Sequence, residues 1–352
     1  MWTDNEIYKA DLNEIISDNN IPWQLLKEKD ILITGATGLI GSLAVNALLY
    51  ANQVLGLGCR IHAVVRNIDK AEKQYDKQLK ADLGLRLIVQ DICSFEQFSG
   101  NLDYIIHGAS LTASKSFINE PVETITTAIK GTEHMLELAR RKKVKSFIYL
   151  SSMEIYGTPD TEERITEEHE SSLNAMVVRN SYPISKLMCE NMCACYALEY
   201  GIKTTVMRLT QTFGPGVDYN DGRVFAEFAR CVLEEQDIVL HTAGKTKRSY
   251  LYTADTIRAI FTILLCGNSG EAYNAANEST YCSIYDMACL AAKECAGGKI
   301  AVKRETEPDI NTYGYLSELY MNLDTAKLKK LGWKPLHDLN DMFKRMCDSM
   351  RS

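Results

Sequence analysis

The most constraining feature of the sequence is a glycine-rich turn that directly follows a short apolar run. Ile31–Thr34 has the length and composition of a buried strand, and the residues after the turn, 41–50, have helical spacing. Between them, the glycines of TGATGLIG follow a GxxGxxG spacing. A strand, a glycine turn and a helix in this order present free backbone N–H groups and the positive helix end, which bind a pyrophosphate. We therefore expect a dinucleotide cofactor here, contacted by Gly35, Thr37, Gly38, Leu39, Ile40 and Gly41.

The first 210 residues alternate short apolar runs with helical stretches, which is typical of parallel βαβ units in an α/β fold. Besides 31–34, the expected strands are 61–65, 85–89, 104–107, 147–151 and 204–208, and the expected helices include 41–50, 122–140 and 182–200. Continuously apolar strands predict a sheet that is covered on both faces. The alternation loosens beyond about Gln211. We expect a nucleotide-binding lobe over 1–210, with a short N-terminal leader, and a smaller lobe over 211–352, from which about 237–262 returns to the first lobe.

Composition and charge exclude several classes of protein. The 352 residues are 46% hydrophobic and 24% charged, which is ordinary for a globular chain and excludes disorder or a coiled-coil rod. With 39 basic and 46 acidic residues and no basic block, binding to nucleic acid is not expected. No apolar run approaches the roughly 20 residues that span a bilayer. The 11 cysteines form no CxxC pair and are expected to be reduced thiols of a cytoplasmic protein, without a metal site.

The residues after the second and third expected strands bear on the choice of cofactor. An acid at the tip of the second strand would bind the adenosine ribose 2′-hydroxyl, whereas an arginine accommodates a 2′-phosphate. Arg66 stands there, and no acid does, which tilts the expectation from NAD toward NADP. A plain solvated role for Arg66 is the alternative. Asp91 and Ile92, just after the third strand, are expected to hold the adenine edge.

A second chemical signal has three parts in order along the chain. Ser151 and Ser152 close a strand, and Tyr182 and Lys186 stand four residues apart at the start of a helix. Side chains at this spacing meet on one helical face. An ammonium beside a phenol favours the phenolate and is expected to lower a pKa that starts near 10. The pair would then act as a general base on a hydroxyl group.

Several further motifs carry a family resemblance. They are HGAS at 107–110, SSMEIYG at 151–157, YPISK at 182–186, RLTQTFGPG at 208–216, NDGRVFAEF at 220–228, GKTKRSYLYTAD at 244–255 and LDTAKLKKLGWKP at 323–335. As a set they resemble the extended short-chain dehydrogenase/reductases, in the branch of NAD-dependent nucleotide-sugar epimerases and dehydratases. The resemblance covers nearly the whole chain. It implies a Rossmann-type doubly wound parallel sheet, a smaller C-terminal α/β lobe for a nucleotide sugar, and a homodimer formed through a four-helix bundle.

The resemblance also implies roles for individual residues. Tyr182 would be the base, Lys186 its electrostatic partner and a ligand of the cofactor ribose, and Ser152 the hydrogen-bond partner of the sugar oxygen. Ala109 of the HGAS segment would lie on the cofactor side, where His107 packs and does not act as a base. The substrate would be held by Gln211, Arg223 and Arg248, the two arginines gripping its diphosphate.

The shared first step implied by the resemblance is oxidation at C4 of the sugar, which gives a 4-keto intermediate. The 4,6-dehydratases carry an Asp-Glu pair where this chain has Met153 and Glu154, so the acid for simple dehydration is missing. UDP-glucuronate decarboxylases have Ser-Glu there, which fits Glu154 with Arg248, but many epimerases also carry this glutamate. An epimerase/dehydratase, a decarboxylase-like enzyme and an NADPH-dependent ketoreductase therefore all stay open. A non-catalytic redox sensor is the remaining alternative, and it would typically lack the Tyr/Lys pair.

Overall fold

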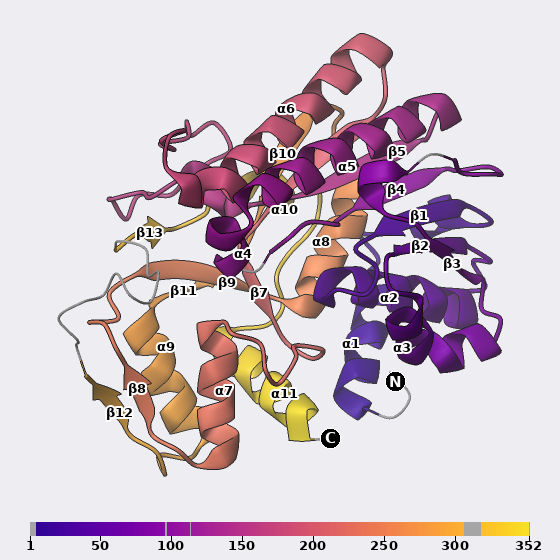
Figure 1. Cartoon of the computed structure of the whole chain (residues 1–352). Coiled ribbons are helices and arrows are strands. Elements are labelled where there is room, and N and C mark those ends of the chain that lie inside the picture. The colour runs from indigo at the N-terminus through magenta and orange to yellow at the C-terminus, as the bar shows by residue number, and fades with distance from the viewer. Residues whose placement is uncertain (1–4, 96, 113, 306–317, 352) are drawn as a thin grey trace.

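The computed structural model describes residues 5–95, 97–112, 114–305 and 318–351, and its centre is a parallel sheet of seven strands (Figure 1). In spatial order the strands are β10 (Glu271–Ala275), β6 (Thr204–Leu209), β5 (Ser146–Ser152), β4 (Tyr104–His107), β1 (Asp30–Thr34), β2 (Arg60–Val65) and β3 (Leu85–Val89). The order runs outward in both directions from the junction of β1 and β4, which makes the sheet doubly wound. The predicted Rossmann-type sheet is confirmed.

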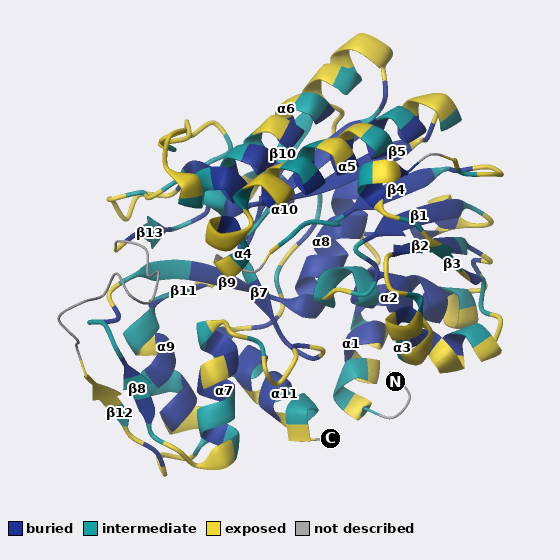
Figure 2. Cartoon of the chain, viewed as in Figure 1, coloured by how far each residue is buried: buried dark blue, intermediate teal, exposed yellow. Residues whose placement is uncertain are grey.

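Helices cover both faces of this sheet, and each face has its own apolar core. One layer contains α4 (Ser114–Asn119), α5 (Pro121–Lys142) and α6 (Ser181–Tyr200); the other contains α2 (Leu39–Leu55), α3 (Ile68–Lys80) and α8 (Thr253–Cys266). Along β1, Ile31 and Ile33 pack with the α2 and α8 side chains, whereas Leu32 packs with those of α5 and α6. Alternate residues of a strand face opposite sides, so the all-apolar strands of the sequence follow from this double cover. Figure 2 shows the buried strands between the two layers.

The N-terminal leader is a folded part of the first lobe. Its helix α1 (Glu6–Ile16) begins at Asn5, whose side chain accepts a hydrogen bond from the Tyr8 backbone N–H at 2.9 Å. Leu12 and Ile15 are fully buried in the core shared with α2 and α8. Its acids do not all face outward, since Asp11 and Asp18 are buried.

The smaller lobe is built around β9 (Lys247–Tyr252). This strand pairs with β7 (Gln211–Phe213), β11 (Asn277–Ser283) and β13 (Tyr320–Met321), and a separate two-stranded sheet joins β8 (Ile238–Leu240) to β12 (Val302–Arg304). The helices of this part are α7 (Val224–Glu234), α9 (Ile284–Leu290), α10 (Ala326–Lys329) and α11 (Leu339–Arg351). Among the helices that the structure describes, none has both the length and the apolar character needed to cross a membrane.

The segment that returns to the first lobe differs from the expected 237–262. The returning elements are α8, which packs against α2, and β10, which pairs with β6 at the edge of the large sheet, so the return spans 253–275. β8, inside the expected range, instead pairs with β12 in the smaller lobe. β10 reads EAYNA and is only partly apolar, which is why the sequence did not single it out as a sheet strand.

Candidate active site

The glycine-rich turn lies at the carboxyl end of β1 and leads into α2. Gly35 has a φ of +69°, and Gly38 is the N-cap of α2 without a side chain to cap it. A Cβ on Gly41 would lie 2.2 Å from the Gly35 carbonyl oxygen, so turn and helix approach more closely than any other residue allows. The first N–H groups of this 17-residue helix are thus left for a ligand, and the cradle fits a pyrophosphate. Thr37, Leu39 and Ile40 are partly exposed around it.

Thr34 ties this turn to the segment that follows β4. Its Oγ1 accepts hydrogen bonds from the backbone N–H groups of Gly108 and Ala109, both at 3.1 Å, and lies 2.7 Å from His107 Nδ1. Burial and the nearby Lys186 charge lower the pKa of His107 to about 3, so its ring is neutral at ordinary pH. Ala109 therefore lies beside the glycine turn, and His107 has a packing role there.

Arg66, Asp91 and Ile92 lie after β2 and β3, at the same edge of the sheet as the glycine turn. Arg66 is exposed, and Asp91 accepts a hydrogen bond from the Cys93 N–H at 2.8 Å. The Ile92 side chain is buried against Gly131 of α5, where an added Cβ would come within 2.5 Å of it. The Ile92 carbonyl also lies 2.8 Å from His134 Nδ1, and a contact of Ile92 with a cofactor stays a prediction.

Ser152, Tyr182 and Lys186 come together at the carboxyl end of β5. Ser152 is the last residue of this strand, Tyr182 the second residue of α6, and Lys186 follows one helical turn later. The Ser152 hydroxyl interacts with the Tyr182 phenol in the direction that lowers the phenol pKa, and Lys186 Nζ lies 5.6 Å from the centroid of the Tyr182 ring. Ser151 Oγ instead donates a hydrogen bond to the Glu190 carboxylate of α6. This arrangement supports the choice of Ser152 over Ser151.

The charge state of the pair differs from the expectation. Burial raises the pKa of the Tyr182 phenol well above its usual range, the Glu154 carboxylate acts in the same direction, and hydrogen bonding and the Arg179 charge offset only part of this. Burial also lowers the pKa of Lys186 to about 8, and its Nζ donates to the Leu150 carbonyl at 2.8 Å. The expected lowering of the phenol pKa by Lys186 is therefore wrong for the protein's own groups. A nicotinamide ring bound beside the phenol would add a positive charge that acts to lower this pKa.

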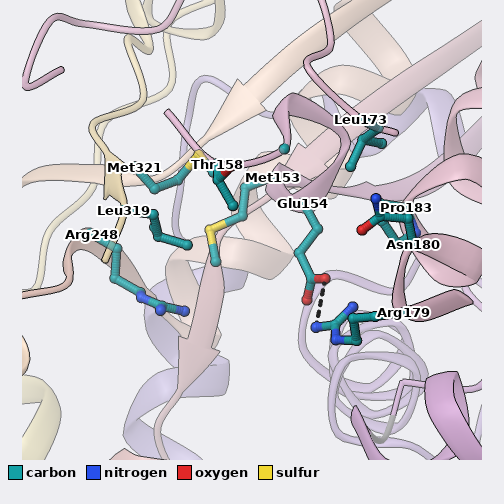
Figure 3. Close-up of a pocket in the computed structure, with 11 residues that line it drawn as sticks. Met153, Glu154, Thr158, Leu173, Arg179, Asn180, Pro183, Arg248, Leu319 and Met321 are labelled. Atoms are coloured by element: carbon teal, nitrogen blue, oxygen red, sulfur yellow. Dashed lines mark hydrogen bonds and ion pairs between the residues drawn. The ribbon is translucent and has the colours of Figure 1, made fainter. Parts of the chain in front are cut away.

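A pocket opens beside these residues, between the two lobes (Figure 3). Its lining comes from the segment after β5, the start of α6, β9 and the segment at β13: Met153, Glu154, Gly157, Thr158, Leu173, Arg179, Asn180, Pro183, Arg248, Leu319 and Met321. In Figure 3 the Arg248 side chain extends toward Met153, while Glu154 and Arg179 face each other from the opposite side. Arg179 Nη2 donates to Glu154 Oε2 at 3.1 Å. The pocket is thus mainly apolar and also contains two guanidinium groups, one carboxylate and the polar side chains of Thr158 and Asn180.

The three expected substrate residues have different surroundings. Arg248 lines the pocket, and within the described part of the chain its buried Nε has no hydrogen-bond partner. The buried Gln211 Oε1, on neighbouring β7, likewise has none there. Polar atoms left in this state are costly, so both fit a site that a polar ligand completes. Arg223 lies outside this pocket lining at the N-cap of α7, 42% exposed and held by Asp221 at 2.5 Å. Its role toward substrate stays a prediction.

Sequence reasoning missed Arg179 and Phe117. Arg179 stands three residues before Tyr182 but lies in a separate short 3-10 helix, Val178–Asn180, and its nearness in sequence to Tyr182 is the signal that could have pointed to it. Phe117 is 65 positions away from Tyr182 in α4, yet the two rings stack with centroids 4.3 Å apart and an interplanar angle of 5°. A contact across that distance follows from the packing of α4 on α6 and leaves no local pattern.

Comparison with known proteins gives one family and consistent relatives. The model of the "NAD dependent epimerase/dehydratase family" matches residues 31–276. UDP-glucuronic acid decarboxylase 1 of Xenopus tropicalis is 27% identical over 323 residues, which cover 91% of this chain and 72% of the relative. UDP-N-acetyl-alpha-D-glucosaminuronate decarboxylase of Bacillus cytotoxicus is 28% identical over 256 residues, which cover 71% of this chain and 76% of the relative.

Solved structures share the fold. UDP-glucose 4-epimerase of Thermotoga maritima, with UDP-glucose, superposes with a TM-score of 0.74 at 22% identity, covering 92% of this chain and 98% of the other. UDP-glucuronic acid 4-epimerase of Bacillus cereus, in complex with NAD, gives a TM-score of 0.73 at 21% identity with the same coverage. The family match spans well over half of the chain and includes the glycine turn, Ser152, Tyr182 and Lys186. The chain therefore belongs to the NAD dependent epimerase/dehydratase family.

Proposed function

We propose that this protein is an NAD(P)-dependent enzyme that acts on a nucleotide-diphosphate sugar by transient oxidation of its C4 hydroxyl. The observation that carries the proposal is the Ser152, Tyr182 and Lys186 group, which joins the cofactor edge of the sheet to the pocket that Arg248 lines. The glycine turn and the uncapped start of α2 support a dinucleotide on the opposite side of this group.

The chain's own residues then have distinct tasks. Tyr182, as the phenolate, takes the proton of the sugar hydroxyl while Ser152 holds the same oxygen by a hydrogen bond. Lys186 supplies positive charge beside the phenol and a donor toward the cofactor ribose. The bound nicotinamide supplies the hydride acceptor and a positive charge. Since burial alone keeps the phenol protonated, the base becomes active only in the loaded site.

A decarboxylase-like reaction is the second candidate, and a specific observation favours it. Glu154 is neutralised by Arg179, so Arg248 leaves the pocket with a net positive charge next to the catalytic group. Such a pocket suits a sugar that carries a carboxylate, and relatives named UDP-glucuronic acid decarboxylase agree with this reading. A panel of nucleotide sugars read by mass decides: loss of carbon dioxide, loss of water or no mass change separate decarboxylase, dehydratase and epimerase. Stoichiometric cofactor consumption would indicate the ketoreductase, and cofactor binding without any spectral change would indicate the redox sensor.

We also propose a preferred cofactor, an oligomeric state and a cellular location. Exposed Arg66 after β2 favours NADP, and a comparison of NAD and NADP dissociation constants tests it. A homodimer is supported by exposed apolar side chains on α5 and α6, where Val122, Met188 and Leu198 are 74%, 48% and 90% exposed. A monomer in sedimentation would contradict it. The eleven free cysteines support a cytoplasmic location, which cell fractionation tests.

The proposal is tested by Tyr182→Phe. The substitution keeps the ring that stacks on Phe117 and removes only the hydroxyl, so fold and cofactor binding should be retained. Turnover of the active nucleotide sugar should fall on the order of 10²- to 10⁴-fold, because the general base is lost. Near-normal turnover in this variant would exclude Tyr182 as the base.

A further inference from the structure

A continuous chain of four side chains runs from the Tyr182 phenol to the wall of the pocket. The Tyr182 ring stacks on Phe117 at 4.3 Å, and the Arg179 guanidinium carbon lies 4.8 Å from the centroid of the Phe117 ring. Arg179 in turn donates to Glu154 at 3.1 Å, as the dashed line in Figure 3 shows. A flat guanidinium suits this place because it can cover an aromatic ring and bind a carboxylate at once.

The Glu154–Arg179 pair is shielded from solvent on most of its surface. The side chain of Arg179 is 17% exposed and that of Glu154 28%, while Phe117 is 1% exposed. The Glu154 backbone is also fixed, since its N–H donates to Ser152 Oγ at 3.2 Å. Both ends of Glu154 are therefore held, one by the catalytic serine and the other by Arg179.

We propose that Arg179 is a positioning residue, which holds the Glu154 carboxylate at the pocket wall and balances its charge beside Tyr182. This inference rests on the proposed function, in which Tyr182 and Glu154 face the sugar. The two arginines of the pocket then have different roles. Arg248 has a buried Nε without a partner among the described residues and faces the ligand, whereas Arg179 is paired with Glu154.

The electrostatics of the phenol agree with this geometry. The Glu154 charge raises the pKa of Tyr182 and the Arg179 charge lowers it. Removal of Arg179 would leave the Glu154 charge unbalanced beside the phenol, so the phenolate would form only at a higher pH. A helix-packing role for Arg179 would have no such consequence.

The experiment is the pH dependence of kcat for Arg179→Met, Arg179→Lys, Glu154→Gln and the double variant Arg179→Met/Glu154→Gln. In Arg179→Met the acidic limb of the kcat–pH profile, where kcat rises with pH, should shift to higher pH by about 0.5 to 1 unit. At neutral pH its kcat should fall about three- to tenfold, with KM within about threefold. Arg179→Lys keeps the positive charge, so its acidic limb should lie between those of the wild type and Arg179→Met. The double variant should return the limb to the position of Glu154→Gln, because the unbalanced charge is gone. An unmoved limb in Arg179→Met, or a limb that stays displaced in the double variant, would overturn the proposal.

A second readout does not depend on finding the sugar. The ultraviolet absorbance of tyrosinate, taken as the difference from Tyr182→Phe in the NAD-loaded protein, should titrate at higher pH in Arg179→Met than in the wild type. Arg164→Met is the matched control, since Arg164 is 57% exposed and paired with Glu278 at 3.0 Å, away from the phenol. If no nucleotide sugar is turned over by the wild type, the proposed function fails while this titration still decides the role of Arg179.

Discussion

At the scale of single residues, Arg248 is the side chain whose surroundings most directly favour the binding of an anionic ligand. Its buried Nε lacks a partner within the described residues, and it enters the pocket from the smaller lobe. Arg248→Ala should raise the substrate KM at least about tenfold, which corresponds to 1.4 kcal/mol or more, because a charge-assisted contact to substrate is lost. NAD(P) dissociation constants should stay within a factor of about two, since the glycine turn belongs to the other lobe. Steady-state kinetics and cofactor titration measure both.

Lys247→Ala is the matched control for Arg248→Ala. Lys247 is the preceding residue of β9, where successive side chains point to opposite faces, and it pairs with exposed Glu162 at 2.8 Å. Removal of the Lys247 side chain should leave the substrate KM and the NAD(P) dissociation constants near their wild-type values. Equal weakening of substrate and cofactor in Arg248→Ala would instead point to a folding defect, and an unchanged KM would remove Arg248 from the substrate site.

At the scale of elements, α2 depends on two glycines for different reasons. Gly41, in the first turn of the helix, packs against the Gly35 carbonyl, and Gly56 ends the helix in the left-handed region with φ of +63° and open space around it. Gly41→Ala should cost about 1–3 kcal/mol of stability and abolish the cradle, because a Cβ 2.2 Å from a backbone oxygen forces the turn to move. Gly56→Ala should cost about 1–2 kcal/mol and leave cofactor affinity unchanged. Denaturant unfolding measures the loss of stability, and cofactor titration measures the loss of affinity. Intact cofactor binding in Gly41→Ala would contradict the proposal that the glycine turn binds the cofactor.

Elements that carry a local pattern were predictable, and those defined by their neighbours were not. The expected strands 85–89 and 104–107 coincide with β3 and β4. β4 is buried throughout, and the edge strand β3 was readable from its Leu, Ile and Val residues although it is partly exposed and contains Arg86. β10 joins the sheet through its backbone with a mixed sequence, so only the fold reveals it. In the site, Tyr182 and Lys186 share a helix and were readable from spacing. Phe117 reaches the phenol from another helix, and the raised phenol pKa comes from burial, which no spacing encodes.

At the scale of the whole molecule, an ionic cluster joins the N-terminal helix to the last one. His337 Nε2 lies 2.9 Å from Glu14 of α1, and its Nδ1 bonds Asp341 of α11. Ligand atoms of Glu14, Asp255 and His337 lie within 4.8 Å of one another. The imidazolium already serves as the cation there, because both ring nitrogens are engaged by carboxylates, so we propose no metal at this place. The cluster closes the chain by joining segments 323 residues apart.

The stability of this closure should depend on pH with a definite sign. Burial disfavours the imidazolium, but hydrogen bonds to Glu14 and Asp341 outweigh it and raise the pKa of His337 from 6.5 to about 9. A raised pKa means that the folded state binds the proton more tightly. Its contribution to stability is therefore complete below about pH 6.5 and is lost as the pH rises through 9. Burial also raises the pKa of Asp11 on α1 from 3.8 to about 7, which destabilises the fold as the pH rises over that range.

The thermal midpoint of the wild type should accordingly fall between about pH 6.5 and 9, and His337→Gln isolates the contribution of the imidazolium. The variant should be less stable than the wild type near pH 6.5, where Glu14 and Asp341 lose their shared cation, and the difference should close toward pH 9. The slope that Asp11 causes should extend to higher pH in His337→Gln, because the His337 charge lowers the pKa of Asp11 in the wild type. His169→Gln, at an exposed histidine, should follow the wild type throughout. A gap between His337→Gln and the wild type that is the same at every pH would mean that His337 stabilises the closure by packing on Tyr252, whose ring lies 4.2 Å away, and not by its charge.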